Sequence, residues 1–165
     1  METRLRSVFR EGLVSGLIGY AVVILVVAAA DLFASHPLFF TPALLGSYLF
    51  FDVRDPANVV IWAGPVIAYN GLHLVIFLLF GLFMAALAAL ADHGQQMWYI
   101  AANIFLIVVM HVVGIPILFD PVVSNALSLV TVITATTMAA VGMAVYLWRA
   151  HAPAHSRYDI VTEQA

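Results

Sequence analysis

Long apolar stretches separated by short polar segments set the pattern of this chain. Four of them reach or exceed the ~20 residues that a helix needs to cross the hydrocarbon core of a bilayer. They cover residues 13–32, 65–91, 98–118 and 122–148. The pattern predicts an all-α integral membrane protein with a four-helix bundle of up-and-down topology, so that residues 1–165 form a single transmembrane domain.

The connection between the first two stretches, residues 33–64, is the only long one that the pattern predicts. Its first half is too apolar for a free loop and too short to cross a membrane. We therefore expect an interfacial or re-entrant helix in this first external loop, lying on the bundle as a lid, with a binding platform for a partner or lipid as the alternative. The aromatic residues of the loop, which would form much of an aromatic belt, are Phe39, Phe40, Tyr48, Phe50, Phe51 and Trp62.

Three polar residues that precede a proline mark expected helix starts: Asp120, Asp55 and Thr41. A side-chain oxygen at the N-cap accepts a bond from a backbone N–H of the first turn, and a proline just after it loses nothing by lacking an N–H. Asp120 would begin the fourth span, and the other two would begin short helices in the first loop.

The arginines predict the orientation in the membrane. Those on the side of the two termini are Arg4, Arg6, Arg10, Arg149 and Arg157, against Arg54 alone on the other side. The positive-inside rule therefore predicts that both termini, including the polar tail at 149–165, are cytoplasmic in a bacterial inner membrane. The first apolar stretch exceeds the roughly 7–15 residues of a signal-peptide core, so we expect a retained helix, with cleavage near 28–31 as the alternative.

The composition excludes several classes of protein. The chain is 64% hydrophobic and 9% charged, with a mean hydropathy of +1.06. Cysteine is absent, which excludes disulfides and thiolate metal sites. Lysine is absent too, which excludes a Schiff-base pigment, and the net charge of −3 argues against a nucleic-acid partner.

Two histidines inside the apolar stretches are the strongest candidates for a functional site. His73 and His111 each lie roughly 10–12 Å from the same membrane surface at 1.5 Å of helix rise per residue. Their helices, joined by a short turn, should pack as antiparallel neighbours. Ionisable groups inside hydrocarbon are costly, and they mark functional sites by default. Tyr69 and Asn70 share a helix face with His73, and Ser128 lies near the same depth.

Three interpretations of this pair remain open. The histidines are bonded to Tyr69, Asn70, Ser128 or a backbone carbonyl and simply hold helices together; or they are axial ligands of haem b or bacteriochlorophyll, with the same three residues around them; or they join a metal or quinone site. The rim residues that would complete that third site are Asp31, His36, Asp52, Asp55 and Asp120.

A face of small residues occupies the start of the first span. Gly12, Ser15, Gly16 and Gly19 include a G-x-x-x-G pair, which permits close approach of two helices. Packing within the bundle and contact with another subunit are equally compatible with this face.

Two segments carry a family resemblance. Residues 36–46 (HPLFFTPALLG), which follow Leu32, and residues 143–151 (MAVYLWRAH) resemble an uncharacterised family of small bacterial four-span membrane proteins. The resemblance implies the four-span topology, and no activity and no site residue come with it.

No hydrolase, P-loop or dinucleotide-binding motif is present, and no acid lies in the middle of a span. We therefore expect a non-catalytic accessory or structural subunit of a larger bacterial membrane complex, respiratory or photosynthetic. Its partners would be the lipid bilayer and other membrane subunits, or further copies of itself. The alternative is an electron-transfer protein that binds haem, bacteriochlorophyll or a metal through His73 and His111.

Overall fold

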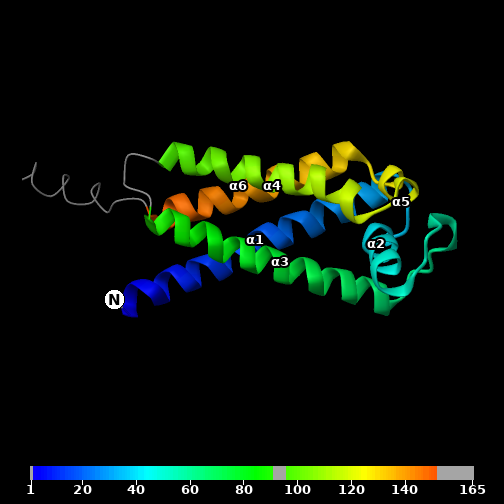
Figure 1. Cartoon of the computed structure of the whole chain (residues 1–165), viewed down its shortest axis with the longest axis horizontal. Helices are drawn as coiled ribbons and strands as arrows, with labels where there is room; N and C mark the ends of the chain where they lie inside the picture. Colours follow the sequence, from blue (N-terminus) through cyan, green and yellow to red (C-terminus); the bar gives the residue numbers. More distant parts are fainter. Residues whose placement is uncertain (1, 91–95, 152–165) are drawn as a thin grey trace, which may run out of the picture.

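Four long helices lie lengthwise beside one another, and shorter elements gather at one end of them (Figure 1). The computed structural model describes residues 2–90 and 96–151, and the predicted tail beyond 151, with Arg157, lies outside them. The elements are α1 (Glu2–Phe33), α2 (Phe40–Phe51), the 3-10 helix η1 (Pro56–Asn58), α3 (Ala63–Leu90), α4 (Gln96–Leu118), α5 (Pro121–Ala126) and α6 (Leu129–His151). The predicted all-α class is confirmed for these residues.

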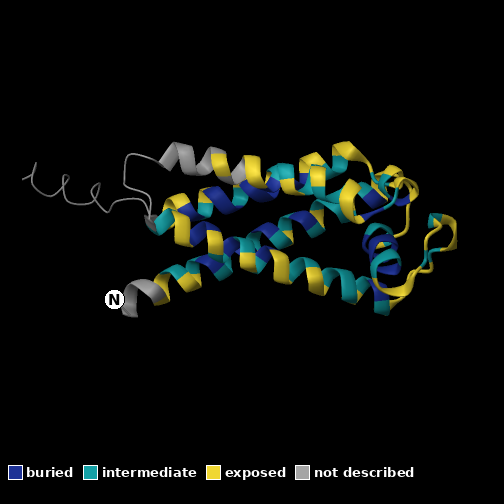
Figure 2. Cartoon of the chain, viewed as in Figure 1, coloured by how far each residue is buried: buried dark blue, intermediate teal, exposed yellow. Residues whose placement is uncertain are grey.

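Three of the helices are long and apolar enough to cross a membrane: Arg6–Phe33, Ala63–Ala89 and Leu129–Ala150. Only 22%, 22% and 33% of their most apolar windows are buried inside the molecule. Their apolar side chains therefore face outward along most of their length (Figure 2), as lipid-facing helices require. The chain is a membrane protein. In α4, the apolar stretch whose residues are all described, Phe105–Leu118, is shorter than these three.

Helix α1 is the centre of the packing. It packs extensively against α3 and α6, and α4 packs on α6. The consecutive helices α3 and α4 make few contacts, so the expectation that they pack as close neighbours holds only locally. They meet where His73 and Phe77 approach His111.

The small-residue face packs inside the molecule. A Cβ added to Gly16 would lie 2.5 Å from the backbone oxygen of Phe77, and one added to Gly12 would lie 2.7 Å from the Cα of Leu82. Ser15 is fully buried. A Cβ added to Gly19 would lie 2.5 Å from the sulfur of Met143 in α6. These residues allow α1 to contact α3 and α6 closely, so the face is already occupied by helices of the same chain.

Helix α2 is packed into the end of the bundle, whereas we expected a lid on its surface. All six residues from Pro42 to Ser47 are buried, on every side of the helix. Leu44 and Leu45 contact Phe119 and Val123, and these four form a buried cluster. Burial on all sides explains why this segment carries no polar face.

Two of the three predicted N-caps are confirmed. The Asp120 side chain accepts from the N–H groups of Val122 and Val123, both at 3.1 Å, and Asp55 caps η1. The prediction for Thr41 was wrong. Helix α2 begins at Phe40, and Thr41 donates its hydroxyl and its N–H to Asp31 instead.

The predicted fourth span is broken near its start. Helix α5 ends at Ala126, and α6 begins two residues further on, at Leu129. Ser128 lies in the break, where its side-chain oxygen accepts from the N–H of Thr131 at 3.3 Å. A serine at an N-cap competes in this way with a continuous helix.

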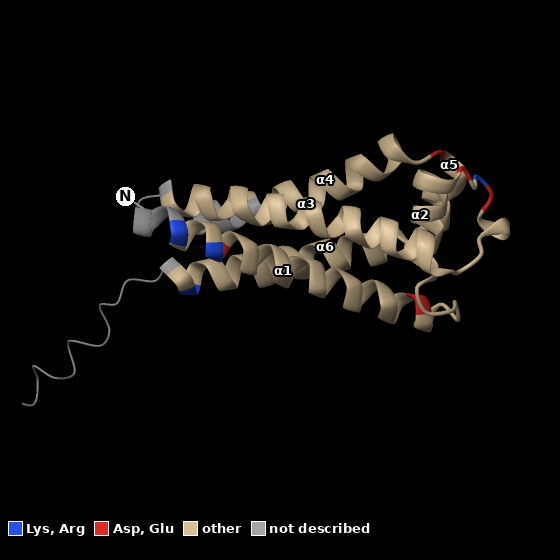
Figure 3. Cartoon of the chain, turned by 90° about the horizontal axis from the view of Figure 1, so that it is seen from below, with Lys and Arg blue, Asp and Glu red and all other residues tan. Residues whose placement is uncertain are grey.

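The charged residues lie at the two ends of the long axis, with uncharged residues between them (Figure 3). Arg6 and Arg10 at the start of α1 lie at the same end as Arg149 near the end of α6. The opposite end, formed by α2, η1 and α5 and named the α2 end, carries Asp31, Asp52, Arg54, Asp55 and Asp120.

Candidate functional site

A cavity of about 120 Å³ lies toward the α2 end of the bundle. It is lined by residues of all four long helices together with α2 and α5. Its polar lining consists of Asp31, His36, Thr41, Tyr69, His73, His111, Ser128, Thr131 and Thr136. The structure thus brings both histidines, Tyr69 and Ser128, which the sequence placed at a similar depth, to one cavity. Asn70 is not in its lining.

The burial of the lining residues shows where the cavity opens. His36, Ala126 and Ser128 are exposed, and they come from the loop before α2 and from the break between α5 and α6. Ala135 and Thr136 are buried and lie deeper along α6. The cavity therefore opens at the α2 end and closes toward the middle of the bundle.

His73 lies in a column of rings on α3. Its ring centroid is 5.2 Å from that of Tyr69 and 5.2 Å from that of Phe77, four residues away on either side. The ring of His111 meets that of His73 edge to face, with centroids 5.8 Å apart. The His111 ring also lies 6.2 Å from that of Phe77, so it meets two rings of α3 at this depth.

The hydrogen bond of His111 fixes its tautomer. Its Nδ1 lies 3.0 Å from the backbone oxygen of Ile107. A carbonyl oxygen only accepts, so Nδ1 must carry the proton. In the neutral ring the other nitrogen, Nε2, is then an acceptor.

His73 has an unsatisfied nitrogen. Among the described residues, its Nε2 is buried and has no hydrogen-bond partner. Buried polar atoms in folded proteins are nearly always paired, because an unpaired one loses its bonds to water without replacement. Two of the three proposed side-chain partners are engaged elsewhere: the Asn70 side chain donates to the Val66 carbonyl at 2.8 Å, and Ser128 caps α6. His111 bonds a backbone carbonyl, as the structural interpretation allows, but one of its own helix. Neither histidine shows an interhelical hydrogen bond among the described residues.

Asp31 is the rim carboxylate that reaches the cavity. It is 3% exposed, and its two oxygens accept from the hydroxyl of Thr41 at 2.5 Å and from the Thr41 N–H at 3.0 Å. It therefore caps the start of α2 from another helix. The sequence placed Asp31 among the candidate ligands, but no local motif indicates its pairing with Thr41, ten residues further on.

The other three rim carboxylates are engaged outside the cavity. Asp120 and Asp55 cap α5 and η1, and Asp52 pairs with Arg54 at 2.7 Å. This hydrogen bond raises the pKa of the Arg54 guanidinium above its usual value. The same guanidinium lies 4.4 Å from the ring centre of Tyr48.

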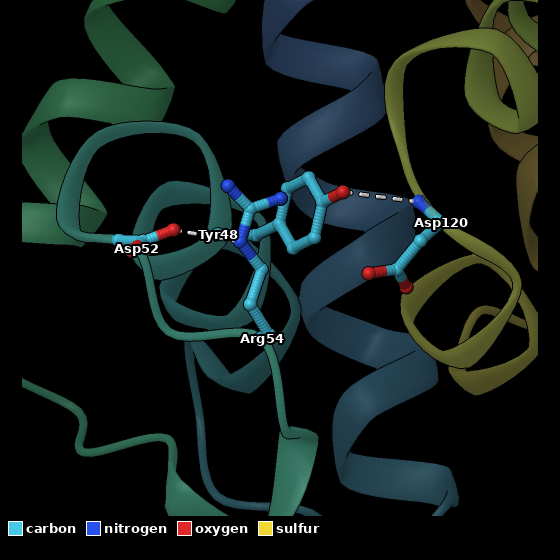
Figure 4. A network of polar contacts seen from close by, with 4 residues as sticks. All are labelled: Tyr48, Asp52, Arg54 and Asp120. Atoms are coloured by element: carbon cyan, nitrogen blue, oxygen red, sulfur yellow. Dashed lines mark hydrogen bonds and ion pairs between the residues drawn. The ribbon is translucent and has the colours of Figure 1, made fainter.

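Tyr48 connects this surface group to the start of α5. Its hydroxyl oxygen accepts the backbone N–H of Asp120 at 3.2 Å (Figure 4). Its ring also contacts that of Phe119, with centroids 5.3 Å apart. The network fixes the turn between α4 and α5 against α2, which holds the wall of the cavity in place.

A second cavity of about 50 Å³ lies beside the first. Six residues line both cavities and form the partition between them: Val23, Val27, Asp31, Thr41, Tyr69 and His73. Asn70 lines only the smaller cavity.

The size and the ligand set limit what these cavities hold. Ligand and cofactor sites usually measure about 300–1,000 Å³, so a haem or bacteriochlorophyll ring does not fit a cavity of about 120 Å³. Within residues 2–90 and 96–151, no three His, Asp or Glu side chains are grouped to hold a metal ion. The larger cavity suits a few water molecules, at ~30 Å³ each, or one compact molecule.

Comparison with known proteins does not add a family to this geometry. The family resemblance of residues 36–46 and 143–151 stays a prediction, and the proposed function is based on the geometry of the cavity. No family model, curated protein or solved structure matches the chain.

Proposed function

We propose that this protein is a non-catalytic membrane protein that binds a small polar ligand in the cavity beside His73 and His111. The observation that carries the proposal is the buried Nε2 of His73, which has no partner among the described residues although the ring lines both cavities. A bound ligand supplies the missing interaction. The acceptor Nε2 of His111 is available to the same ligand.

The hydrogen bonds support binding over catalysis. A nucleophile in an enzyme is held by a general base, which is oriented by a third group. Neither histidine bonds a hydroxyl or a carboxylate within the described part of the chain. The haem alternative is less favoured because the cavity is too small for the ring.

The proposed topology has four spans, with α4 as the additional one. Its 23 residues extend about 35 Å at 1.5 Å per residue, which is enough to cross the hydrocarbon core. The arginines of α1 and α6 lie opposite the α2 end, which favours cytoplasmic termini in a bacterial inner membrane. The cavity would then open on the outer side. Exposed Phe50, Phe51 and Trp62 suit an interfacial position for that end.

A role as an accessory subunit of a respiratory or photosynthetic complex stays a prediction. Its sequence support was the absence of a reaction motif and of an acid in the middle of a span, together with the small-residue face. Of these, the small-residue face is used within the chain, since Gly12 and Gly16 contact α3. Copurification of defined subunits with the tagged chain would support this role independently of the cavity.

The test of the proposed function uses single cysteines, since the chain contains none of its own. Thr131 lines the cavity, whereas Thr134, on the same helix, is exposed on the outer surface and does not line it. In lipid nanodiscs, Thr131→Cys should react with a charged methanethiosulfonate that enters from water. The matched control Thr134→Cys should stay unreactive among lipid tails. An unreactive Thr131→Cys in folded protein would overturn the proposal.

A further inference from the structure

The carboxylate of Asp31 is buried without a cation. Its side chain lines both cavities and is 3% exposed. Among the described residues, no arginine or histidine forms an ion pair with it. A buried charge is costly unless it is paired or coordinates an ion, and in a membrane it marks a functional site. The carboxylate therefore lacks a counter-charge among the described residues, and a bound cation would supply one.

Thr41 satisfies only part of the carboxylate. Its two donors occupy one acceptor position on each oxygen. An ionised carboxylate offers about four such positions. About two of them therefore remain for a ligand that reaches either cavity.

The rest of the lining also favours a positively charged ligand over an anion. No arginine is among the lining residues of either cavity, and the chain has no lysine. In its neutral tautomer, His111 presents an acceptor rather than a donor. The N-terminus of α6 would attract an anion, but the oxygen of Ser128 already accepts from its first turn. An anion would find neither an arginine nor a lysine beside Asp31.

We infer that the ligand of this site is a compact monovalent cation, with the Asp31 carboxylate as its counter-charge and His73 beside it; this rests on the proposed function. The volume of about 120 Å³ limits the ligand to a small alkylammonium ion or an inorganic ion with a few waters. A tightly held transition metal would need more ligating side chains than the described residues group together.

The first experiment is thermal unfolding of the full chain in lipid nanodiscs at constant ionic strength. Methylammonium chloride or sodium chloride replaces N-methylglucamine chloride, whose cation is too large for the cavity. A ligand that binds only the folded state raises Tm in a saturable way. We expect a saturable rise with at least one of the two small cations. Equal Tm values in all three salts would overturn the inference.

Variants assign the effect to Asp31. Asp31→Asn should abolish the rise in Tm. Asp120→Asn is the matched control, because Asp120 is also a helix-capping carboxylate at the α2 end but lines neither cavity. It should keep the full rise. Loss of the rise in the control, or its persistence in Asp31→Asn, would contradict the assignment.

A protection assay covers the case in which Asp31→Asn does not fold. The small cationic reagent 2-aminoethyl methanethiosulfonate modifies Thr131→Cys, and a small cation that occupies the same cavity should slow this reaction at least threefold. Slowing by methylammonium alone indicates an ammonium-type ligand, and slowing by sodium alone indicates an inorganic ion. If Thr131→Cys reacts but neither cation protects it, the cation inference fails while the cavity stands. If it does not react at all, the proposed function itself fails.

Discussion

The imidazole rings of His73 and His111 lie edge to face with their centroids 5.8 Å apart, and they join two helices that otherwise make few contacts. Each ring is held by its own helix. His73 stacks between Tyr69 and Phe77, and His111 bonds the Ile107 carbonyl. The pair is therefore positioned from both sides before any ligand arrives, which is the arrangement a binding site requires.

Purified protein is expected to show no Soret band, either oxidised or reduced with dithionite. The reason is that the cavity of about 120 Å³ does not accommodate a macrocycle. An absorbance spectrum of protein extracted in mild detergent tests this. A Soret band in near-equal stoichiometry with the chain, lost in His73→Ala or His111→Ala, would contradict the prediction and favour the electron-transfer alternative.

Gly81→Ala should destabilise the protein by about 1–3 kcal/mol, the usual cost of overpacking. The added Cβ would collide with the backbone oxygen of Gly12 and would lie 2.5 Å from the backbone nitrogen of Gly16, so α1 and α3 would have to separate. Unfolding in detergent measures the change. Gly71→Ala on the same helix is the control, since a Cβ there has no atom within 4 Å.

The control Gly71→Ala should leave stability unchanged or raise it by up to about 1 kcal/mol, because alanine favours helix over glycine. Equal stability of the two variants would mean that the close contact between α1 and α3 does not form.

Tyr48→Phe should cost about 1 kcal/mol, because the backbone N–H of Asp120 loses its acceptor. The ring contacts with Arg54 and Phe119 remain in this variant. Tyr20→Phe serves as the control, since the hydroxyl of Tyr20 has no hydrogen bond among the described residues. Thermal unfolding of both variants in the same detergent measures the two losses of stability. Equal losses would mean that the Tyr48 hydroxyl does not hold the start of α5 against α2.

Asp120→Ala should lower stability by about 0.5–2 kcal/mol, the usual cost of losing an N-cap. Its carboxylate accepts from two N–H groups of α5. Asp52→Asn removes only the charge of an exposed ion pair, which is worth about 0–1 kcal/mol, and keeps a residue type that tolerates the φ of 55° at this position. Chemical unfolding should therefore rank the Asp120 variant as the less stable, and the reverse order would contradict the capping geometry.

Local chemistry made part of this structure predictable. Long apolar runs predict helices because a backbone in lipid has to satisfy its own hydrogen bonds. Asp120 and Asp55 cap helices because a short acidic side chain before a proline has few other local partners. The shared depth of His73 and His111 follows from the rise of an α-helix and the positions of the loops.

The lateral arrangement came from the tertiary structure alone. The hydrophobic patterns of α1, α3, α4 and α6 do not distinguish a lipid-facing side from a protein-facing one, because lipid tails are as apolar as leucine. Which helix the Gly16 face contacts is decided by close packing against the backbone of Phe77. The same holds for Asp31 and Thr41, which meet only because α2 turns back into the end of the bundle. The sequence by itself determined the long helices, the caps of α5 and η1 and the positions of the histidines along their helices, whereas packing decided which polar groups share a cavity.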